Sequence, residues 1–270
     1  MTPHHRPRPR PRGRRRLAAG LLALAPVLAL APAGPTSPAS AEPPAGYYDS
    51  AEGLTGAALE AELHDIVSAG VTTLTYSEVW DGLQQTDADP DDPSSVVLFY
   101  QGTAHPASDH GGGVDQWNRE HLWAQSHGDF GTSPGPGTDL HHLRPTDVTV
   151  NSARGNLDFD EGGTENAEAP GNYRDGDSWE PRDADKGDVA RAILYMSMRY
   201  EGDDGWPDLE VDDATGGSGP RHGRLSTLLG WNAADPPSAF EQHRNDVVFE
   251  LQGNRNPFID HPEWADEIWG

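Results

Sequence analysis

Two strings near the middle of the chain hold residue types that could carry out a hydrolysis. WNREHLW begins at Trp117 and contains adjacent Glu120 and His121, and DLHHLRPTDVTVNSARGN begins at Asp139 and contains Asn151. A histidine of near-neutral pKa can take a proton from water at physiological pH. Carboxylate and amide oxygens are hard ligands that suit Mg²⁺ or Ca²⁺. Because the arginines of the same strings match phosphate oxygens, the set predicts metal-assisted hydrolysis of a phosphodiester.

A short run of elements must position these residues. We expect a strand over 117–122 and a returning strand over 140–143. Pro145 and Thr146 then suit a helix entrance, with Thr146 as the N-cap and Asp147 in the first turn. The predicted order is strand, loop, strand, helix.

This order decides whether the polar side chains can meet. Successive strand residues point to opposite faces, so Glu120 and His121 reach one site only if the chain bends or enters a loop there. Asn151 would lie about one turn into the helix, facing back over the hairpin.

Three separated strings resemble the bacterial endonuclease I family of secreted or periplasmic nucleases, within the ββα-metal (His-Me finger) superfamily. They are WNREHLWAQSHG, TDLHHLRPTDVTVNSARGN and, over residues 252–264, QGNRNPFIDHPEW. They occur in the family's order and span most of residues 96–264. The resemblance implies cleavage of DNA, often of RNA as well, with little sequence specificity and with 5′-phosphate products.

The resemblance also implies roles for individual residues. By motif position, His121 corresponds to the general base, and Glu120 and Asn151 to the two protein ligands of one divalent cation. That cation is usually Mg²⁺, with Mn²⁺ or Ca²⁺ as alternatives, and water and phosphate would complete its coordination. Arg144 and Arg154 are the candidates for phosphate contacts.

Other polar residues of these strings leave alternatives open. Some relatives use an arginine in the loop between the two strands, but residues 122–138 contain none, so the phosphate clamp must come from elsewhere. Arg119 could instead form an ordinary salt bridge. His141 and His142 do not suggest zinc, because adjacent strand residues face opposite ways and no cysteine completes a site. We expect one of them to orient the site or to pack beneath it.

The N-terminus has the three regions of a secretory signal peptide. Residues 1–16 carry seven arginines and no acid, residues 17–30 are apolar, and an Ala-Ser-Ala string ends at Ala41. We therefore expect a signal peptide over 1–41, cleavage near Ala41, and a nuclease domain over 42–270. The apolar region is too short to span a bilayer permanently. The predicted product is secreted, without stable membrane association.

Composition and apolar spacing predict one mixed α+β domain with peripheral helices and long loops, and the resemblance implies a ββα-metal (His-Me finger) core within it. The chain has 31 glycines, 24 prolines and no cysteine, so loops are plentiful and neither a disulfide framework nor a thiolate site is available. We expect a monomer. Helices are predicted over 55–69, 188–200 and 238–251, a buried strand over 96–100, and long loops over 127–138, 158–187 and 202–219.

The charge of the chain argues against a simple basic DNA-binding module. The net charge is −25, and removal of residues 1–41 with their seven arginines deepens it to −32. Residues 101–156, however, carry six acids and three arginines, and a bound divalent ion would bring that segment to about −1. This near-neutral segment is where we expect the substrate that the resemblance implies, DNA with RNA as a further substrate, to bind.

Two other functions remain as alternatives to a metal-dependent endonuclease. One is a catalytically silent extracellular protein on the same fold that binds nucleic acid or cations. The other is a phosphoesterase acting on small esters, which the lack of Asp- and His-rich two-metal spacing disfavours.

Overall fold

The predicted strand, loop, strand and helix are present in the middle of the chain. In the computed structural model, strand β3 (Trp117–His121) pairs with antiparallel β4 (Leu143–Asp147), so that Glu120 lies opposite Arg144 and His121 opposite Leu143. Helix α3 (Val148–Arg154) follows β4 directly. The structure describes Met1 and residues 42–217 and 219–270. The predicted signal peptide over 1–41 lies outside these residues, apart from Met1.

The returning strand and the helix start differ from the prediction. Residues 140–142 form a turn, so the strand begins at Leu143 instead of ending there. Pro145 and Thr146 belong to the strand and not to a helix entrance, because a two-stranded sheet tolerates a proline at its edge. The N-cap of α3 is Asp147, whose side chain accepts hydrogen bonds from the backbone N–H groups of residues 149 (2.8 Å) and 150 (3.1 Å).

Helices read from apolar spacing are confirmed. The predictions over 55–69, 188–200 and 238–251 correspond to α1 (Gly56–Ser68), α4 (Lys186–Arg199) and α6 (Ala239–Gln252). Ser238 caps α6 as expected, accepting from the backbone N–H of Glu241. The spacing of apolar residues therefore identified three helices correctly.

The strand predicted over 96–100 is shorter than expected. Strand β1 (Ser95–Leu98) pairs with antiparallel β2 (Thr103–Pro106), and the 3₁₀ turn η1 (Phe99–Gln101) joins them. The turn closes through Gly102, which has a φ of 62° that glycine adopts without strain.

Segments expected to be long loops contain further short elements. Residues 158–187 contribute a four-stranded sheet in the order β5-β8-β7-β6, which the Gly-, Pro- and Asp-rich composition concealed. The remaining elements are α2 (Glu78–Thr86), η2 (Pro136–Thr138), β5 (Asp158–Phe159), β6 (Thr164–Glu165), β7 (Tyr173–Arg174), β8 (Ser178–Glu180), β9 (Glu210–Val211), β10 (Arg221–His222), α5 (Leu225–Ala234), α7 (Pro257–Asp260) and α8 (Trp264–Trp269). The described residues thus form a mixed α+β fold.

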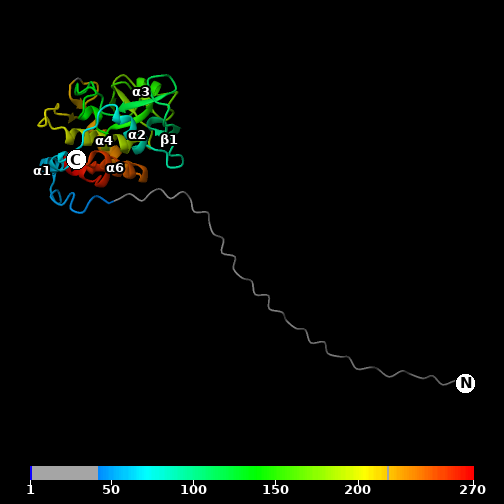
Figure 1. Cartoon of the computed structure of the whole chain (residues 1–270), viewed down its shortest axis with the longest axis horizontal. Coiled ribbons are helices and arrows are strands. Elements are labelled where there is room, and N and C mark those ends of the chain that lie inside the picture. Colours follow the sequence, from blue (N-terminus) through cyan, green and yellow to red (C-terminus); the bar gives the residue numbers. More distant parts are fainter. Residues whose placement is uncertain (2–41, 218) are drawn as a thin grey trace. The chain divides into compact units, whose positions relative to one another are not determined.

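Two apolar clusters support the strands and α3. The larger one surrounds α4, which packs on α1 and α5, and Figure 1 shows α1 beside the C-terminus, where it contacts α8. The smaller cluster lies where α2, β1 and β4 meet α6, and includes Val79, Leu83, Leu143 and Val248. Residues 42–217 and 219–270 belong to one compact unit.

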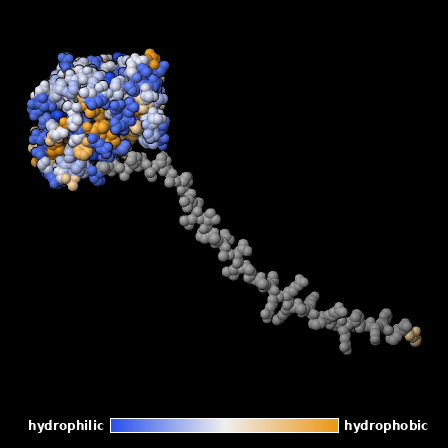
Figure 2. All heavy atoms as spheres, in the orientation of Figure 1, coloured by the Kyte–Doolittle hydropathy of each residue, from blue (hydrophilic) through white to orange (hydrophobic). Residues whose placement is uncertain are grey.

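The visible surface of this unit is predominantly hydrophilic, with apolar atoms in scattered groups (Figure 2). Apart from Met1, Val114 is the only large hydrophobic residue exposed among those that the structure describes. Within the same residues, no helix combines the length and the apolar character that crossing a bilayer requires.

The two residues at the junction of β4 and α3 make a matched test of the helix start. We predict that Asp147→Ala lowers the free energy of unfolding by about 1 kcal/mol, because it removes the N-cap. Thr146→Val should leave stability unchanged or raise it, since the buried Thr146 hydroxyl has no partner among the described residues. Urea unfolding of both variants checks this. A larger loss in Thr146→Val than in Asp147→Ala would contradict the assignment.

Candidate active site

A pocket of about 380 Å³ lies where β3 ends. Its lining includes Asn118, Arg119, Glu120 and His121 from β3, together with Asn151 from α3. The structure therefore brings together the three residues that the sequence proposed as base and metal ligands. A larger pocket of about 590 Å³ lies elsewhere and contains no histidine.

The end of the strand explains how two adjacent residues share one pocket. His121 is the last residue of β3, and the chain bends at the next two residues. A pocket at this bend is reached from both faces of the strand, so Glu120 and His121 both line it. This is the bend that the sequence required.

Glu120 is buried and held by two groups. Its Oε1 accepts a hydrogen bond from the Tyr100 hydroxyl at 3.0 Å and lies 3.1 Å from Nη1 of Arg154. Burial raises the pKa of Glu120, while the Arg154 charge and the Tyr100 hydrogen bond act in the opposite direction. Both side-chain contacts involve the same oxygen, Oε1.

The amide of Asn151 is oriented by Asn118. Nδ2 of Asn151 donates to Oδ1 of Asn118 at 2.8 Å, and no described residue donates to Oδ1 of Asn151. One carboxylate oxygen and one amide oxygen facing the same pocket are hard ligands of the kind that Mg²⁺, Mn²⁺ or Ca²⁺ accepts alongside water. The donor set therefore fits a divalent cation held by Glu120 and Asn151.

His121 is placed to act as a base. Its Nε2 lies 3.0 Å from the carbonyl oxygen of Gly137, which can only accept, so the ring proton belongs on Nε2 and Nδ1 carries the lone pair. The Gln125 amide lies against the ring edge, 3.1 Å from Nε2 and 3.4 Å from Nδ1. Burial, with a smaller effect of nearby His142, lowers the pKa of His121 to about 3, so the ring is neutral at physiological pH.

The two arginines proposed as phosphate contacts are both buried and outside the pocket lining. Arg144 lies 3.1 Å from Asp87 and 2.7 Å from Asp188. Arg154 donates from Nη1 to the carbonyl oxygen of His121 at 2.8 Å. Their contacts are internal, and the structure does not bring either guanidinium to the pocket.

Arg119 lines the pocket instead. Its guanidinium lies 3.4 Å from the centre of the Tyr76 ring and 3.9 Å from that of the Trp80 ring, and it donates to the carbonyl oxygen of Tyr76. No carboxylate of the described residues lies within ion-pair distance of it, so the alternative of an ordinary salt bridge finds no partner there. Its aromatic partners are some forty residues away in the chain, so no local pattern could have predicted this stacking.

His141 and His142 are both buried outside the pocket lining, whereas we expected one of them to orient the site or to pack beneath it. Nε2 of His142 lies 2.7 Å from the carbonyl oxygen of Pro136, its Nδ1 accepts from the backbone N–H of Trp123, and its ring lies 5.4 Å from that of His121. His141 packs against Tyr195 with ring centres 4.4 Å apart and the ring planes tilted by 49°. Neither ring lines the pocket.

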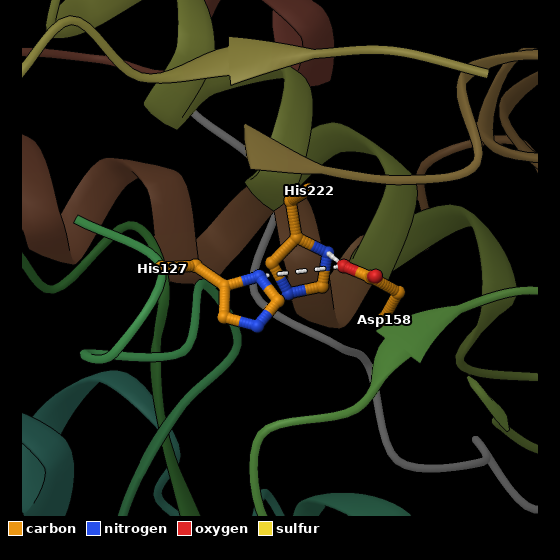
Figure 3. A group of neighbouring side chains, drawn as sticks. All are labelled: His127, Asp158 and His222. Atoms are coloured by element: carbon orange, nitrogen blue, oxygen red, sulfur yellow. Dashed lines mark ion pairs between the residues drawn. The ribbon is translucent and has the colours of Figure 1, made fainter. Parts of the chain in front are cut away.

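A second buried cluster was not found by sequence reasoning. His127, Asp158 and His222 come from three separate segments, and Oδ1 of Asp158 lies 3.4 Å from Nδ1 of His127 and 3.1 Å from Nδ1 of His222 (Figure 3). Their potential ligand atoms all lie within 4.8 Å of one another. The cluster also touches the first site, because Nε2 of His222 lies 3.2 Å from Nη2 of Arg154.

Comparison with known proteins shows the family of the chain. The family model described as Endonuclease I matches residues 55–263, and the chain belongs to the endonuclease I family. It is 64% identical over 225 residues to the extracellular ribonuclease of Bacillus subtilis strain 168 and 61% identical to that of Bacillus amyloliquefaciens, covering 83% of this chain and 78% of each relative. It is 29% identical over 127 residues to an extracellular deoxyribonuclease of Aeromonas hydrophila, covering 45% of this chain and 49% of that protein.

Burial of the paired histidines makes stability depend on pH. Burial lowers the pKa of His141 and of His142 to about 4, although the nearby Asp139 carboxylate acts in the opposite direction. In an unfolded chain a histidine has a pKa of about 6.5. Between pH 6.5 and 4 the unfolded state therefore binds protons that the folded state excludes. The free energy of unfolding must fall as the pH is lowered through this window.

We predict that His141→Gln flattens this pH dependence. The variant takes up one fewer proton on unfolding. The slope of its free energy of unfolding against pH is therefore smaller by about 1.4 kcal/mol per pH unit near pH 5. Urea unfolding at several values between pH 4.5 and 6.5 measures the slope in both proteins. Identical slopes in the variant and the wild type would contradict a neutral, buried His141.

Proposed function

We propose that this protein is a secreted, divalent-metal-dependent endonuclease that hydrolyses DNA and RNA with little sequence specificity and leaves 5′-phosphate ends. The observation that carries the proposal is the single pocket lined by Glu120, His121 and Asn151. The names of the relatives, which include ribonucleases and deoxyribonucleases, support a substrate range that covers both nucleic acids. The succession of β3, β4 and α3 supports a ββα-metal (His-Me finger) core.

Three residues of the pocket have a defined part in the proposed reaction. Glu120 and Asn151 would hold one Mg²⁺, which when bound supplies positive charge to the scissile phosphate and to the departing 3′-oxygen. Nδ1 of His121 takes a proton from the attacking water, while its Nε2–H donates to the Gly137 carbonyl and keeps the ring oriented. Mn²⁺ or Ca²⁺ would use the same oxygens.

Arg119 is the phosphate contact of this proposal. A guanidinium matches two phosphate oxygens, and the stacking of Arg119 on two rings fixes its plane beside the pocket. Arg154 forms an ion pair with Glu120. Arg144 links β4 to Asp87 and Asp188.

Export and assembly complete the proposal. We propose that residues 1–41 are removed near Ala41 and that the remaining 42–270 act outside the cell as a monomer. The extracellular character of the named relatives supports secretion.

The general base can be tested by its removal. We predict that His121→Ala lowers the rate of plasmid and RNA cleavage in Mg²⁺ by roughly 10²- to 10⁴-fold while circular dichroism remains that of the wild type. His243→Gln, which removes a histidine outside the pocket, is the matched control and should retain full activity. Cleavage by His121→Ala at the wild-type rate would refute the mechanism. Tight binding of DNA by the wild type without turnover would instead favour the catalytically silent alternative.

The role of Arg119 can be separated from that of the base. We predict that Arg119→Gln raises KM for RNA by roughly 10- to 100-fold, because it removes a charged hydrogen bond to phosphate, and changes kcat much less. Arg119→Lys should recover part of this loss, since it keeps the charge without the planar fork. Arg221→Gln, at an exposed arginine paired with Asp212, serves as control. An unchanged KM in Arg119→Gln would rule out the phosphate contact.

A further inference from the structure

We propose that His222 is a positioning residue of the nuclease site, and that the buried chain Asp158–His222–Arg154 holds Glu120 in the orientation that binds the cation. This inference rests on the proposed function, because it concerns the cation held by Glu120. The chain begins at the cluster of Figure 3 and ends at the pocket where β3 ends.

Arg154 is the link between the cluster and the pocket. Nη1 lies 3.1 Å from Oε1 of Glu120 and donates to the carbonyl oxygen of His121, and Nη2 donates to the carbonyl oxygen of Leu122. Nη2 also lies 3.2 Å from Nε2 of His222. Arg154 is 1% exposed, so its orientation depends on these internal partners. If the Arg154 guanidinium turned away, the Glu120 carboxylate and the carbonyl groups at the end of β3 would lose their partner together.

The contacts of His222 fix its tautomer. A guanidinium N–H can only donate, so the neighbouring Nε2 of His222 must present its lone pair. Nδ1 faces two acceptors, Oδ1 of Asp158 at 3.1 Å and the carbonyl oxygen of Gly223 at 3.4 Å, and therefore carries the proton. Burial and the nearby Arg154 charge lower the pKa of His222 well below its ordinary value, so the ring stays neutral in this tautomer.

Asp158 holds the far end of the chain. Its Oδ2 accepts from the backbone N–H of Gly216 at 2.7 Å, and its Oδ1 accepts from that of Gly223 at 3.2 Å. The carboxylate is thus fixed by the backbone on both oxygens, and it presents Oδ1 to the imidazole of His222. In metal sites a carboxylate commonly fixes the tautomer of a histidine that ligates the metal. Here the carboxylate fixes a histidine that acts on the proposed ligand Glu120 through Arg154.

The same proton positions argue against a metal ion in the cluster itself. Nδ1 of His127 lies 2.7 Å from the carbonyl oxygen of Arg221, so it too carries a proton. The atoms that face one another are then two N–H groups and one carboxylate, and neither nitrogen offers a lone pair. A cation there would require both Nδ1 atoms to lose their protons. In His222 the proton would move to Nε2 and face the N–H of Arg154.

Two replacements of His222 separate its two nitrogens. The amide oxygen of Gln can take the acceptor position of Nε2, whereas Asn can reach only the position of Nδ1 and leaves Arg154 without its acceptor. Mn²⁺ binding is measured by electron paramagnetic resonance on the full mature protein without nucleic acid. We expect His222→Asn to raise the Kd for Mn²⁺ by about 10- to 100-fold and His222→Gln to change it by less than about threefold.

Activity gives a second readout that general loss of structure would not produce. Because the defect lies in cation affinity, saturating Mg²⁺ should restore kcat of His222→Asn to near the wild-type value while the Mg²⁺ concentration for half-maximal rate stays raised. Long-range ¹H–¹⁵N correlation spectra of the wild type report the tautomer independently of any variant. We expect a protonated Nδ1 and an unprotonated Nε2 in His222.

The outcomes distinguish this inference from the proposed function. Wild-type Kd values in both variants, equal losses in Asn and Gln, or an Nε2–H tautomer would overturn the positioning role. A second, tightly held metal ion in the wild type that both variants lose would also overturn it and make the cluster a metal site. If the wild type itself binds no divalent cation, the proposed function fails along with it.

Discussion

A buried guanidinium needs acceptors for its N–H groups, and the acceptors that the two terminal nitrogens of Arg154 find shape the proposed nuclease site. Where β3 ends, the carbonyl groups of His121 and Leu122 accept from Arg154. The same guanidinium lies against Glu120, so a charge that burial would otherwise penalise has a partner. One side chain thus stabilises both the bend at the end of β3 and the carboxylate that we propose as a cation ligand.

The distribution of charge follows from similar pairings elsewhere. Arg144 and Arg244 share the buried carboxylate of Asp87, and Arg191 pairs with buried Glu241, which ties β4, α4 and α6 together. These arginines compensate buried acids, while the excess acids remain on the surface. In residues 101–156 this leaves Arg119 as the arginine that lines the pocket. A protein with a net charge of −25 therefore still presents a guanidinium at this pocket.

The sequence predicted the local parts of the site and missed the parts made by distant contacts. Glu120, His121 and Asn151 could be grouped because a hairpin and the helix that follows bring them together over a short stretch of chain. The strand start at Leu143 was missed because a Pro-Thr pair is also typical of a helix entrance.

Long-range partners account for the other differences. The sequence predicted phosphate contacts for Arg144 and Arg154. In the structure these two guanidinium groups contact acids and carbonyl groups of other elements. His127 and His222 are 95 residues apart in the sequence. Both contact Asp158 in the folded protein, where His222 is held in β10. The periodic spacing of apolar residues identifies helices. A contact between residues far apart in the sequence leaves no such spacing.

The dependence of cleavage rate on free Mg²⁺, measured for chelated wild-type protein and for Asn151→Ala, tests most directly whether Glu120 and Asn151 hold a catalytic cation. Chelated wild-type protein should be inactive and regain activity as Mg²⁺ is added. Asn151→Ala should need at least about tenfold more Mg²⁺ for half-maximal rate, because an amide ligand is missing. Full activity of the chelated wild type, or the same Mg²⁺ dependence in both proteins, would contradict a catalytic cation held by these two residues.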